Sequence, residues 1–354
     1  MKNILELRLI NQKLTGSTFK KPAEVVEYMG AMQAQEYAMA KWAIGLRLPG
    51  STESIIEKAF NKGEILRTHL LRPTWHFVTP KDIRWMLEVS SPRIQKANGF
   101  MRRKLGLNDK LLKKSINIFI KALEGGKHLT RRALQETLTK NKIVCEGHHL
   151  SHIMMYAELE GIICSGTREE KQFTYALLEE RVPLQKKLKR TEALSELSKR
   201  YFRSRGPATL PDFTAWSNLT VTDAKEGMAS LGKNLSKESF NGRDYYLMPG
   251  PSFESTKRLR SFLMPNYDEY GMAYKDRSAI FDAAKHKAVV SRGNPVFNRT
   301  IILEGRIEGK WQRSFKKNKI IIETFPFEKL GPSKQRDLKE AIDNFEMFVA
   351  NNPD

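Results

Sequence analysis

Residues 130–177 read TRRALQETLTKNKIVCEGHHLSHIMMYAELEGIICSGTREEKQFTYAL, and the order of their elements decides the fold class. Thr130 can cap a helix over residues 131–138, which ends before the break at residues 143–147. The next helix carries one apolar stripe at helical spacing, formed by Leu150, Ile153, Met154 and Ala157. Two extended segments, IICSG and KQFTYAL, then flank a charged turn. Helix, turn, helix and hairpin in this order predict a winged helix-turn-helix.

A second stretch downstream repeats this order of elements. TEALSELSKRYFRSRG, from residue 191, predicts an amphipathic helix. Thr209 with Asp212 three residues later, and Thr220 with Asp223, are typical of helix starts. Asn-Gly at 241–242 joins the extended runs SKESF and RDYYLM, and this pair is the strongest short signal for a hairpin. The stretch predicts a second winged helix.

The N-terminal part follows the same plan. Helical patterns at 1–13, 21–48 and 52–62 precede two strands, ILRTHLL and TWHFVTP, which are separated by Arg72 and Pro73. We therefore predict a third winged helix here.

The C-terminal part differs, because RTIILEG, KWQRSF and KIIIETF predict an antiparallel meander followed by a helix at about 334–350. Residues 253–261 are predicted to connect it to the preceding module. The fold class is thus α+β and mostly helical, with three tandem winged helix-turn-helix modules and a small C-terminal β-rich element with a terminal helix. The predicted boundaries are 1–105, 106–182, 183–252 and 253–354.

The charge balance restricts the choice of partners. The chain has 354 residues, 61 Lys and Arg against 40 Asp and Glu, and a formal charge of +21. Such an excess favours polyanions, because each neutralised phosphate releases condensed counterions. Nucleic acid fits best; the alternative is a merely well-solvated surface. No basic amphipathic helix or lipidation motif indicates a membrane partner.

The remaining composition indicates a compartment. Two cysteines provide no disulfide framework and indicate a reducing environment. The longest apolar runs are too short for a bilayer, and no leading signal segment is recognisable. We expect a cytoplasmic, nucleoid-associated protein. The sequence indicates no cofactor.

Five blocks occur in the order of a known family: QAQ, ILRTHLLRPTWHFVTPKD, RGPATLPDFTAWSNL, LMPNYDEYGMAYKDRS and NPVFNRTIILEGRIEGKW. Together they resemble the winged-helix DNA-binding family that includes the AlkZ-type DNA glycosylases, from about residue 5 to the terminal helix. The resemblance implies three tandem winged helices and a β-rich element around a concave surface of DNA size. It also implies removal of bulky or crosslinked N-alkylpurines from double-stranded DNA. The family's catalytic Q-x-Q pair falls on Gln33 and Gln35.

Two glutamines suit one kind of leaving group. An N7- or N3-alkylated purine is already cationic and departs without being protonated, so the enzyme only has to stabilise the sugar cation and deliver water. A glutamine carbonyl can hold that water without acting as a base, and positioning supplies rate. No lysine lies inside the motif, and Lys41 lies two helical turns on. We therefore predict a monofunctional glycosylase.

The motif sets a structural condition. Residues i and i+2 of a regular helix lie about 200° apart and cannot share one face. Both glutamines can serve one substrate only if the helix breaks near Gly30 or within the motif. Otherwise one of them packs locally while the other is solvated.

Other residues are candidates for the substrate pocket. They are His69, Trp75, His76 and Asp268. Trp75 can stack on a displaced base, although burial of the ring is the alternative. For Asp268 and its neighbour Glu269 a structural role is favoured, and Asp268 in the pocket stays open.

Basic side chains and two histidines are candidates for DNA contacts. They are Arg67, Arg72, Arg102, Arg103, Arg131, Arg132, His149, His152, Lys187, Arg190 and Arg243. An arginine at a hairpin tip, such as Arg243, suits a narrow minor groove. The spacing of His148, His149 and His152 with Cys145 and Cys164 matches no common zinc pattern, so we expect no metal.

Two other classes of protein stay open at this point. A non-catalytic tandem winged-helix protein or transcription regulator would show a preferred sequence and no base release. An RNA-binding accessory protein is the third hypothesis. Tandem modules in one chain make a monomer the simplest expectation.

Overall fold

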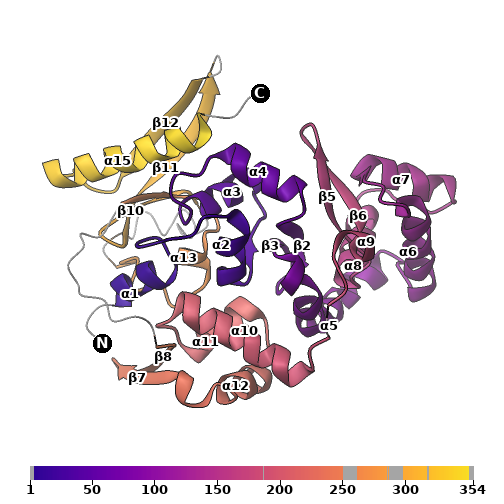
Figure 1. Cartoon of the computed structure of the whole chain (residues 1–354), viewed down its shortest axis with the longest axis horizontal. Helices are drawn as coiled ribbons and strands as arrows, with labels where there is room; N and C mark the ends of the chain where they lie inside the picture. Colours follow the sequence, from indigo (N-terminus) through magenta and orange to yellow (C-terminus); the bar gives the residue numbers. More distant parts are fainter. Residues whose placement is uncertain are drawn as a thin grey trace.

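The computed structural model describes residues 4–185, 187–249, 261–284, 286, 298–316 and 319–350. It has an α+β architecture made of helices and small antiparallel sheets (Figure 1). Within these residues no helix combines the length and apolarity that crossing a membrane requires.

The N-terminal part contains the central sheet. Its elements are α1 (Ile4–Asn11), α2 (Pro22–Met29), β1 (Met32–Gln33), α3 (Tyr37–Gly45), α4 (Glu53–Asn61), β2 (Leu66–Leu70), β3 (Thr74–Val78) and α5 (Pro80–Lys104). The three strands form an antiparallel sheet in the order β1-β3-β2. The strands predicted on both sides of Arg72 and Pro73 are confirmed. The helical pattern at 21–48 is wrong as a continuous segment, because β1 interrupts it.

The second group of elements lies at one end of the molecule (Figure 1). It contains α6 (Asp109–Leu123), β4 (Leu129–Thr130), α7 (Arg131–Lys140), α8 (His149–Leu159), β5 (Ile163–Glu169), β6 (Gln172–Leu177) and α9 (Leu178–Arg181). The Thr130 side chain caps α7 by accepting a bond from the Ala133 amide at 3.2 Å. The predicted stripe from Leu150 to Ala157 is buried and packs on α6 and α7. These elements therefore share a core of their own.

The third group contains α10 (Arg190–Arg205), α11 (Leu210–Ser217), α12 (Val221–Ala229), η1 (Gly232–Asn234), β7 (Ser236–Phe240) and β8 (Arg243–Leu247). Both predicted helix starts are confirmed, since Thr209 and Thr220 accept bonds from the amides three residues later. Asn241 and Gly242 have φ values of 48° and 71°, as a tight hairpin requires. This group covers the central sheet from another side (Figure 1).

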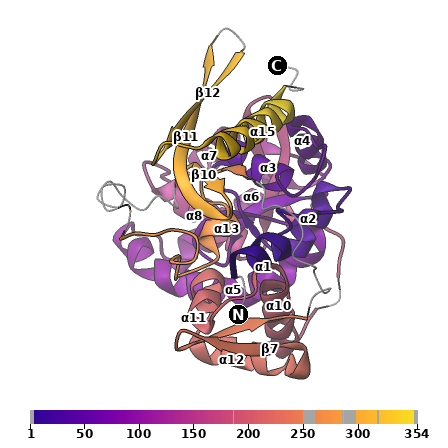
Figure 2. The ribbon, with the colours of Figure 1, turned by 90° about the vertical axis from the view of Figure 1, so that its left-hand side faces the viewer.

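The C-terminal part supplies β9 (Phe262–Met264), α13 (Glu269–Met272), β10 (Thr300–Leu303), β11 (Arg306–Lys316), β12 (Lys319–Pro326) and α15 (Pro332–Val349). The strands form an antiparallel sheet in the order β12-β11-β10-β9, so the predicted meander and terminal helix are confirmed. Figure 2 shows the outer part of the β11–β12 hairpin extending past α15. Of the predicted connection at 253–261, residues 253–260 lie outside the described residues.

The two ends of the chain share one hydrophobic core. On α3, the Trp42 ring meets Phe345 and Phe348 of α15 at centroid distances of 5.1 Å and 4.9 Å. Its indole N–H donates to the Leu263 carbonyl of β9 at 2.6 Å. On the opposite side, Tyr201 and Trp216 of the third group lie in the core that also contains β2 and α5. The region around β1 is therefore enclosed by segments that are distant in sequence.

Candidate active site

The Gln33-Ala34-Gln35 triplet lies at a break between two helices. Helix α2 ends at Met29, and Gly30 follows with a φ of +76°, a conformation that glycine adopts without strain. A Cβ at Gly30 would already touch Met86 Cε and Arg200 Cβ at 3.4 Å. The chain then enters β1, and α3 starts at Tyr37. The condition that the helix must break near Gly30 is met.

The two glutamine side chains differ in exposure. Gln33 is 8% exposed, and its carbonyl oxygen Oε1 is buried without a hydrogen-bond partner in the described structure. Gln35 lies just past β1 and is exposed to solvent. One unsatisfied buried acceptor therefore stands two residues from one solvent-accessible amide.

Buried groups from several elements hold the backbone of the motif. Arg205 of α10 donates from Nη1 to the Met29 carbonyl at 2.7 Å and from Nη2 to the Ala31 carbonyl at 2.8 Å. A carboxylate oxygen of Glu269 accepts the Gln33 amide at 3.1 Å. The motif loop, residues 29–35, is thus fixed to the third group and to α13.

The middle residue of the triplet is held from the sheet. The Ala34 amide donates to the Trp75 carbonyl at 2.7 Å, which extends the ladder beyond β1. The Ala34 carbonyl accepts from Arg67 Nε at 2.9 Å. On the far side of the motif, Arg299 Nη2 donates to Glu36 at 2.7 Å. Gln33 and Ala34 are therefore both bonded through their backbones.

His76 lies beside Gln33. The two residues are cross-strand partners in the β1–β3 ladder, so their side chains share one face of the sheet. His76 Nδ1 lies 2.9 Å from the Thr74 carbonyl, and Arg72 Nη2 lies 3.3 Å from Nε2. Complete burial and then the charge of Arg72 lower the pKa of His76 to about 3. The imidazole is neutral, with Nδ1–H donating to Thr74 and Nε2 accepting from Arg72.

His69 and Trp75 lie on the other face of the sheet. They pair with each other across β2 and β3, and alternation along β3 directs them away from His76 and Gln33. Their rings contact at 4.4 Å between centroids, and His69 Nδ1 bonds Glu158 of α8. The two residues join the central sheet to the second group, so the structure does not bring them to the Gln33 side chain.

Arg67 is a correction to the predicted DNA contacts. The sequence places it at the phosphates, whereas in the structure it is 7% exposed and its guanidinium lies over the rings of Trp75 at 4.3 Å and Phe173 at 4.6 Å. Its bond to Ala34 makes it a support of the motif. Burial lowers the pKa of Arg67 to about 10, so it stays charged at neutral pH. Strand alternation cannot distinguish such a buried arginine from an exposed one.

Asp268 is also engaged elsewhere. Its two oxygens accept from Arg47 Nη1 and Nη2, each at 2.8 Å, and Oδ1 also caps the short helix α13. The cavity that touches Asp268 has a volume of only about 10 Å³, which has no room for a base. The structural role is the one that the geometry supports, and we leave Asp268 out of the candidate pocket.

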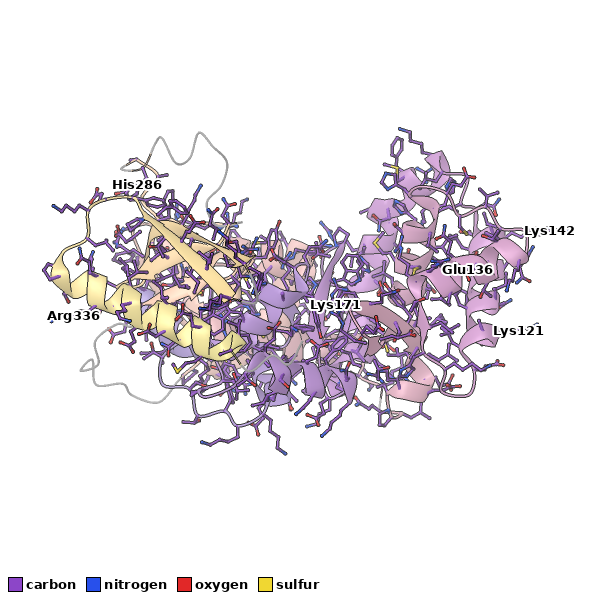
Figure 3. The ribbon with its side chains drawn as sticks, turned by 90° about the horizontal axis from the view of Figure 1, so that it is seen from above. Lys121, Glu136, Lys142, Lys171, His286 and Arg336 are labelled. Carbon is purple, nitrogen blue, oxygen red and sulfur yellow. The ribbon has the colours of Figure 1, made fainter. Side chains whose placement is uncertain are left out.

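The other basic candidates lie nearer the surface. Arg103, Arg132, Lys187, Arg190 and Arg243 are exposed, and four of them form surface ion pairs, with Glu136, Glu88, Asp223 and Asp276. Such pairs are weak and exchange readily for phosphate. Glu136, the partner of Arg132, lies at the end of the molecule opposite Arg336 (Figure 3). These candidates are therefore spread along the molecule.

Five candidates are partly buried, and four of them make internal contacts. Arg72 is partly buried beside His76, Arg102 bonds Gln95, and Arg131 donates to Ser151 at 2.8 Å. The ring nitrogens of His149 lie 2.8 Å and 3.0 Å from the backbone carbonyls of Glu146 and Leu105. His152 is partly buried, and burial, followed by the charge of His148, lowers its pKa. Arg72 thus contacts the central sheet, Arg102 contacts its own helix α5, and Arg131 and His149 make contacts within or next to the second group.

Sequence reasoning missed the two residues that hold the motif. Arg205 is one of several basic residues between 199 and 205, and it begins the family block RGPATLPDFTAWSNL. Glu269 belongs to NYDEY and was weighed only as a partner of Asp268. Both are buried, at 0% and 1% exposure. The sequence feature that could have identified them is their position, since each is a charged residue inside one of the family blocks.

Among the described residues, no group of three or more His, Cys, Asp and Glu side chains is arranged to hold an ion. Cys145 and Cys164 are both free and buried. Burial raises the pKa of Cys164 to about 12, so its thiol is not a nucleophile.

Comparison with known proteins agrees with this geometry. The family model described as "DNA glycosylase AlkZ-like" matches residues 26–348. A relative described as an interstrand DNA cross-link repair glycosylase, from Streptomyces sahachiroi, is 21% identical over 331 residues, which cover 88% of this chain and 87% of the relative. The solved structure of the S. sahachiroi DNA glycosylase AlkZ is similar over 99% of this chain and 97% of its own, with a TM-score of 0.78 and 18% identity. The chain belongs to the AlkZ-like DNA glycosylase family.

Proposed function

We propose that this protein is a monofunctional glycosylase that hydrolyses the N-glycosidic bond of cationic N-alkylpurines in double-stranded DNA. Its substrates would include bulky N7 adducts and interstrand crosslinks, in line with the description of the relative from S. sahachiroi. Gln33 and Gln35 would place the attacking water at C1′. The protein would act as a monomer, close to the nucleoid.

One observation carries this proposal. The carbonyl oxygen of Gln33 is buried and has no partner, while its backbone is bonded to Glu269 and its neighbour Ala34 to Arg67 and Trp75. An unsatisfied buried acceptor costs about 1–3 kcal/mol, a cost that a bound water would remove. Gln35 follows two positions later, in the bend between β1 and α3, and is exposed to solvent. The arrangement supports a water that is held by the buried carbonyl of Gln33 and approached from the side of the exposed Gln35 amide.

The chemistry limits the substrates. Neither glutamine can protonate a leaving group, and the neighbouring His76 is neutral with both nitrogens occupied. Glu269 is fully ionised and buried, so it cannot supply a proton either. Bond cleavage then depends on a base that leaves without protonation, as N7- and N3-alkylpurines do. Unmodified adenine and guanine would remain in the DNA.

The modular organisation supports the DNA-binding part of the proposal. We assign winged-helix modules to 1–105, 106–182 and 183–252, and the β-rich element to 253–354. Each of the first three contains helices followed by an antiparallel hairpin. The exposed cations Arg103, Arg132, Lys187, Arg190 and Arg243 would contact phosphates, helped by Arg102, Arg131, His149 and His152. Arg72 would act at the lesion rather than at the backbone, because it contacts His76.

The substrate class is tested with defined duplexes. We expect the protein to leave heat-labile abasic sites in DNA carrying N7-methylguanine or a nitrogen-mustard crosslink, and none in the unmodified duplex. Release from the unmodified duplex at a similar rate would contradict the role of a cationic leaving group. Unchanged DNA across small, bulky and crosslinked lesions would contradict the proposed function.

A further inference from the structure

The Glu269 side chain lies at the centre of a buried polar network beneath the motif loop. Its Oε1 accepts the Gln33 amide at 3.1 Å. Its Oε2 accepts from Arg205 Nε at 3.0 Å, from Arg205 Nη2 at 2.7 Å and from Trp216 Nε1 at 2.8 Å. Glu269 therefore connects the motif to α10 and α11, which lie on one side of the central sheet (Figure 1).

Arg205 extends the network along the same loop. Its guanidinium donates to the carbonyls of Met29 and Ala31 and lies 4.3 Å from the Trp216 ring. The pair Arg205–Glu269 thus bonds the backbone at residues 29, 31 and 33, which are alternate positions leading into the triplet. The side chains of Arg205 and Glu269 are 0% and 1% exposed. The geometry of the pair is set inside the protein and does not depend on solvent.

No hydrogen bond in the described structure orients the side-chain carbonyl of Gln33. The backbone position therefore sets where this oxygen lies. Rates that depend on positioning fall steeply with displacement, by about 10²-fold for 1 Å. How precisely the Gln33 backbone is positioned therefore determines how precisely its side-chain carbonyl positions the attacking water.

We propose that Glu269 is a positioning residue for base excision. It accepts the Gln33 backbone N–H and is itself held by Arg205, and in this way it sets where the side-chain carbonyl of Gln33 lies. This inference rests on the proposed function, in which Gln33 places the attacking water. Glu269 does not touch the substrate and exchanges no proton. Burial alone would raise its pKa, but the charges of Arg205 and Arg72 and the bonds from Arg205 lower it to about 2.

A second buried pair in this fold provides a matched control. Arg47 is 0% exposed, bonds Asp268 through two nitrogens at 2.8 Å, and also donates to the carbonyls of Gln12 and Ala43. The two pairs resemble each other because each is a buried arginine–carboxylate pair whose arginine also bonds backbone carbonyls. Asp268 and Glu269 are also adjacent in sequence. Only the Arg205–Glu269 pair bonds the motif loop.

The test compares Glu269→Gln, Arg205→Lys and Arg47→Lys in the full-length protein. The readouts are the single-turnover rate of N7-methylguanine release, the Kd for the same duplex and the melting temperature. We expect Glu269→Gln and Arg205→Lys to slow release at least tenfold with Kd changed less than twofold. Arg47→Lys should lower the melting temperature by a similar amount and keep the rate within twofold. If Glu269→Gln does not fold, Arg205→Lys gives the same comparison, because lysine keeps the charge but loses the fork.

Double variants separate positioning from general stability. If Glu269 acts through Gln33, Glu269→Gln should cause no further loss in a Gln33→Ala background, and a further loss of at least tenfold in a Gln35→Ala background. An equal loss in the wild-type and Gln33→Ala backgrounds, or a rate that follows melting temperature in all three single variants, would overturn the inference. If Gln33→Ala itself leaves the rate unchanged, the proposed function fails instead, and the two failures are distinguishable.

Discussion

His76 makes the stability of the folded protein depend on pH, through a proton that only the unfolded chain can bind. Its pKa is about 3 in the folded protein, because burial excludes water and Arg72 is close, against 6.5 when unfolded. Between these values the unfolded state binds one more proton, so stability falls as the pH falls from 6.5 towards 3. The slope is about 1.4 kcal/mol per pH unit, which gives a loss of about 2 kcal/mol at pH 5.

The variant His76→Gln isolates this contribution. Glutamine has no titrating group and keeps an acceptor for Arg72. Reversible urea unfolding, followed by tryptophan fluorescence at pH 7.5 and pH 5, gives the free energy of unfolding at both values. We expect the difference between wild type and variant to shrink by about 2 kcal/mol at the lower pH.

A neighbouring residue provides the control. Thr68 is the cross-strand partner of His76 on the other side, is fully buried, and its hydroxyl has no partner in the described structure. Thr68→Val should change stability by the same amount at both pH values, because no titrating group is removed. If the difference in free energy of unfolding between the wild type and His76→Gln is the same at both pH values, His76 is not a neutral, buried residue in the folded protein.

Three further predictions concern packing, charge and mechanism. Gly227→Ala places a Cβ in a clash with Ser198 Oγ and 2.5 Å from the Leu194 carbonyl. We therefore expect the urea midpoint to fall by an equivalent of about 1–3 kcal/mol. The control Gly331→Ala has no atom within 4 Å and loses only the N-cap preference for glycine at the start of α15, so it should cost less than about 1 kcal/mol. Arg132→Ala should weaken binding to every duplex and make the slope of log K against log salt concentration shallower by about 0.9. Arg132→Lys should keep the slope. An unchanged slope in Arg132→Ala would exclude this phosphate contact. Borohydride should trap no covalent adduct on an alkylated duplex, and robust strand cleavage with trapped protein would contradict a monofunctional mechanism.

Much of the local structure follows from the sequence. The Thr130 and Thr209 caps, the Asn241–Gly242 hairpin and the C-terminal meander occur where short-range signals place them. Each of these signals depends on a few adjacent residues whose φ values or side-chain bonds are local. The helical pattern at 21–48 fails for the opposite reason. Its interruption by β1 depends on pairing with β3, more than 40 residues away in sequence.

The candidate site shows the same division. Gln33 and Gln35 could be selected through the family blocks, because the motif is short and contiguous. The groups that hold it could not be read in this way, since Arg205 reaches Met29 and Ala31 across 176 and 174 residues and Glu269 reaches Gln33 across 236 residues. Arg67 looked like a phosphate contact because arginines are mostly exposed. Only the packing of Trp75 and Phe173 around its guanidinium shows that it is internal.

The central claim is that Gln33 and Gln35 act in base release rather than in DNA binding. The most direct measurement is the single-turnover rate of N7-methylguanine release by Gln33→Ala and Gln35→Ala, together with the Kd of each variant for the same duplex. We expect each rate to fall by about 10²-fold or more, with Kd within about twofold of the wild type. Unchanged rates in both variants would contradict the account.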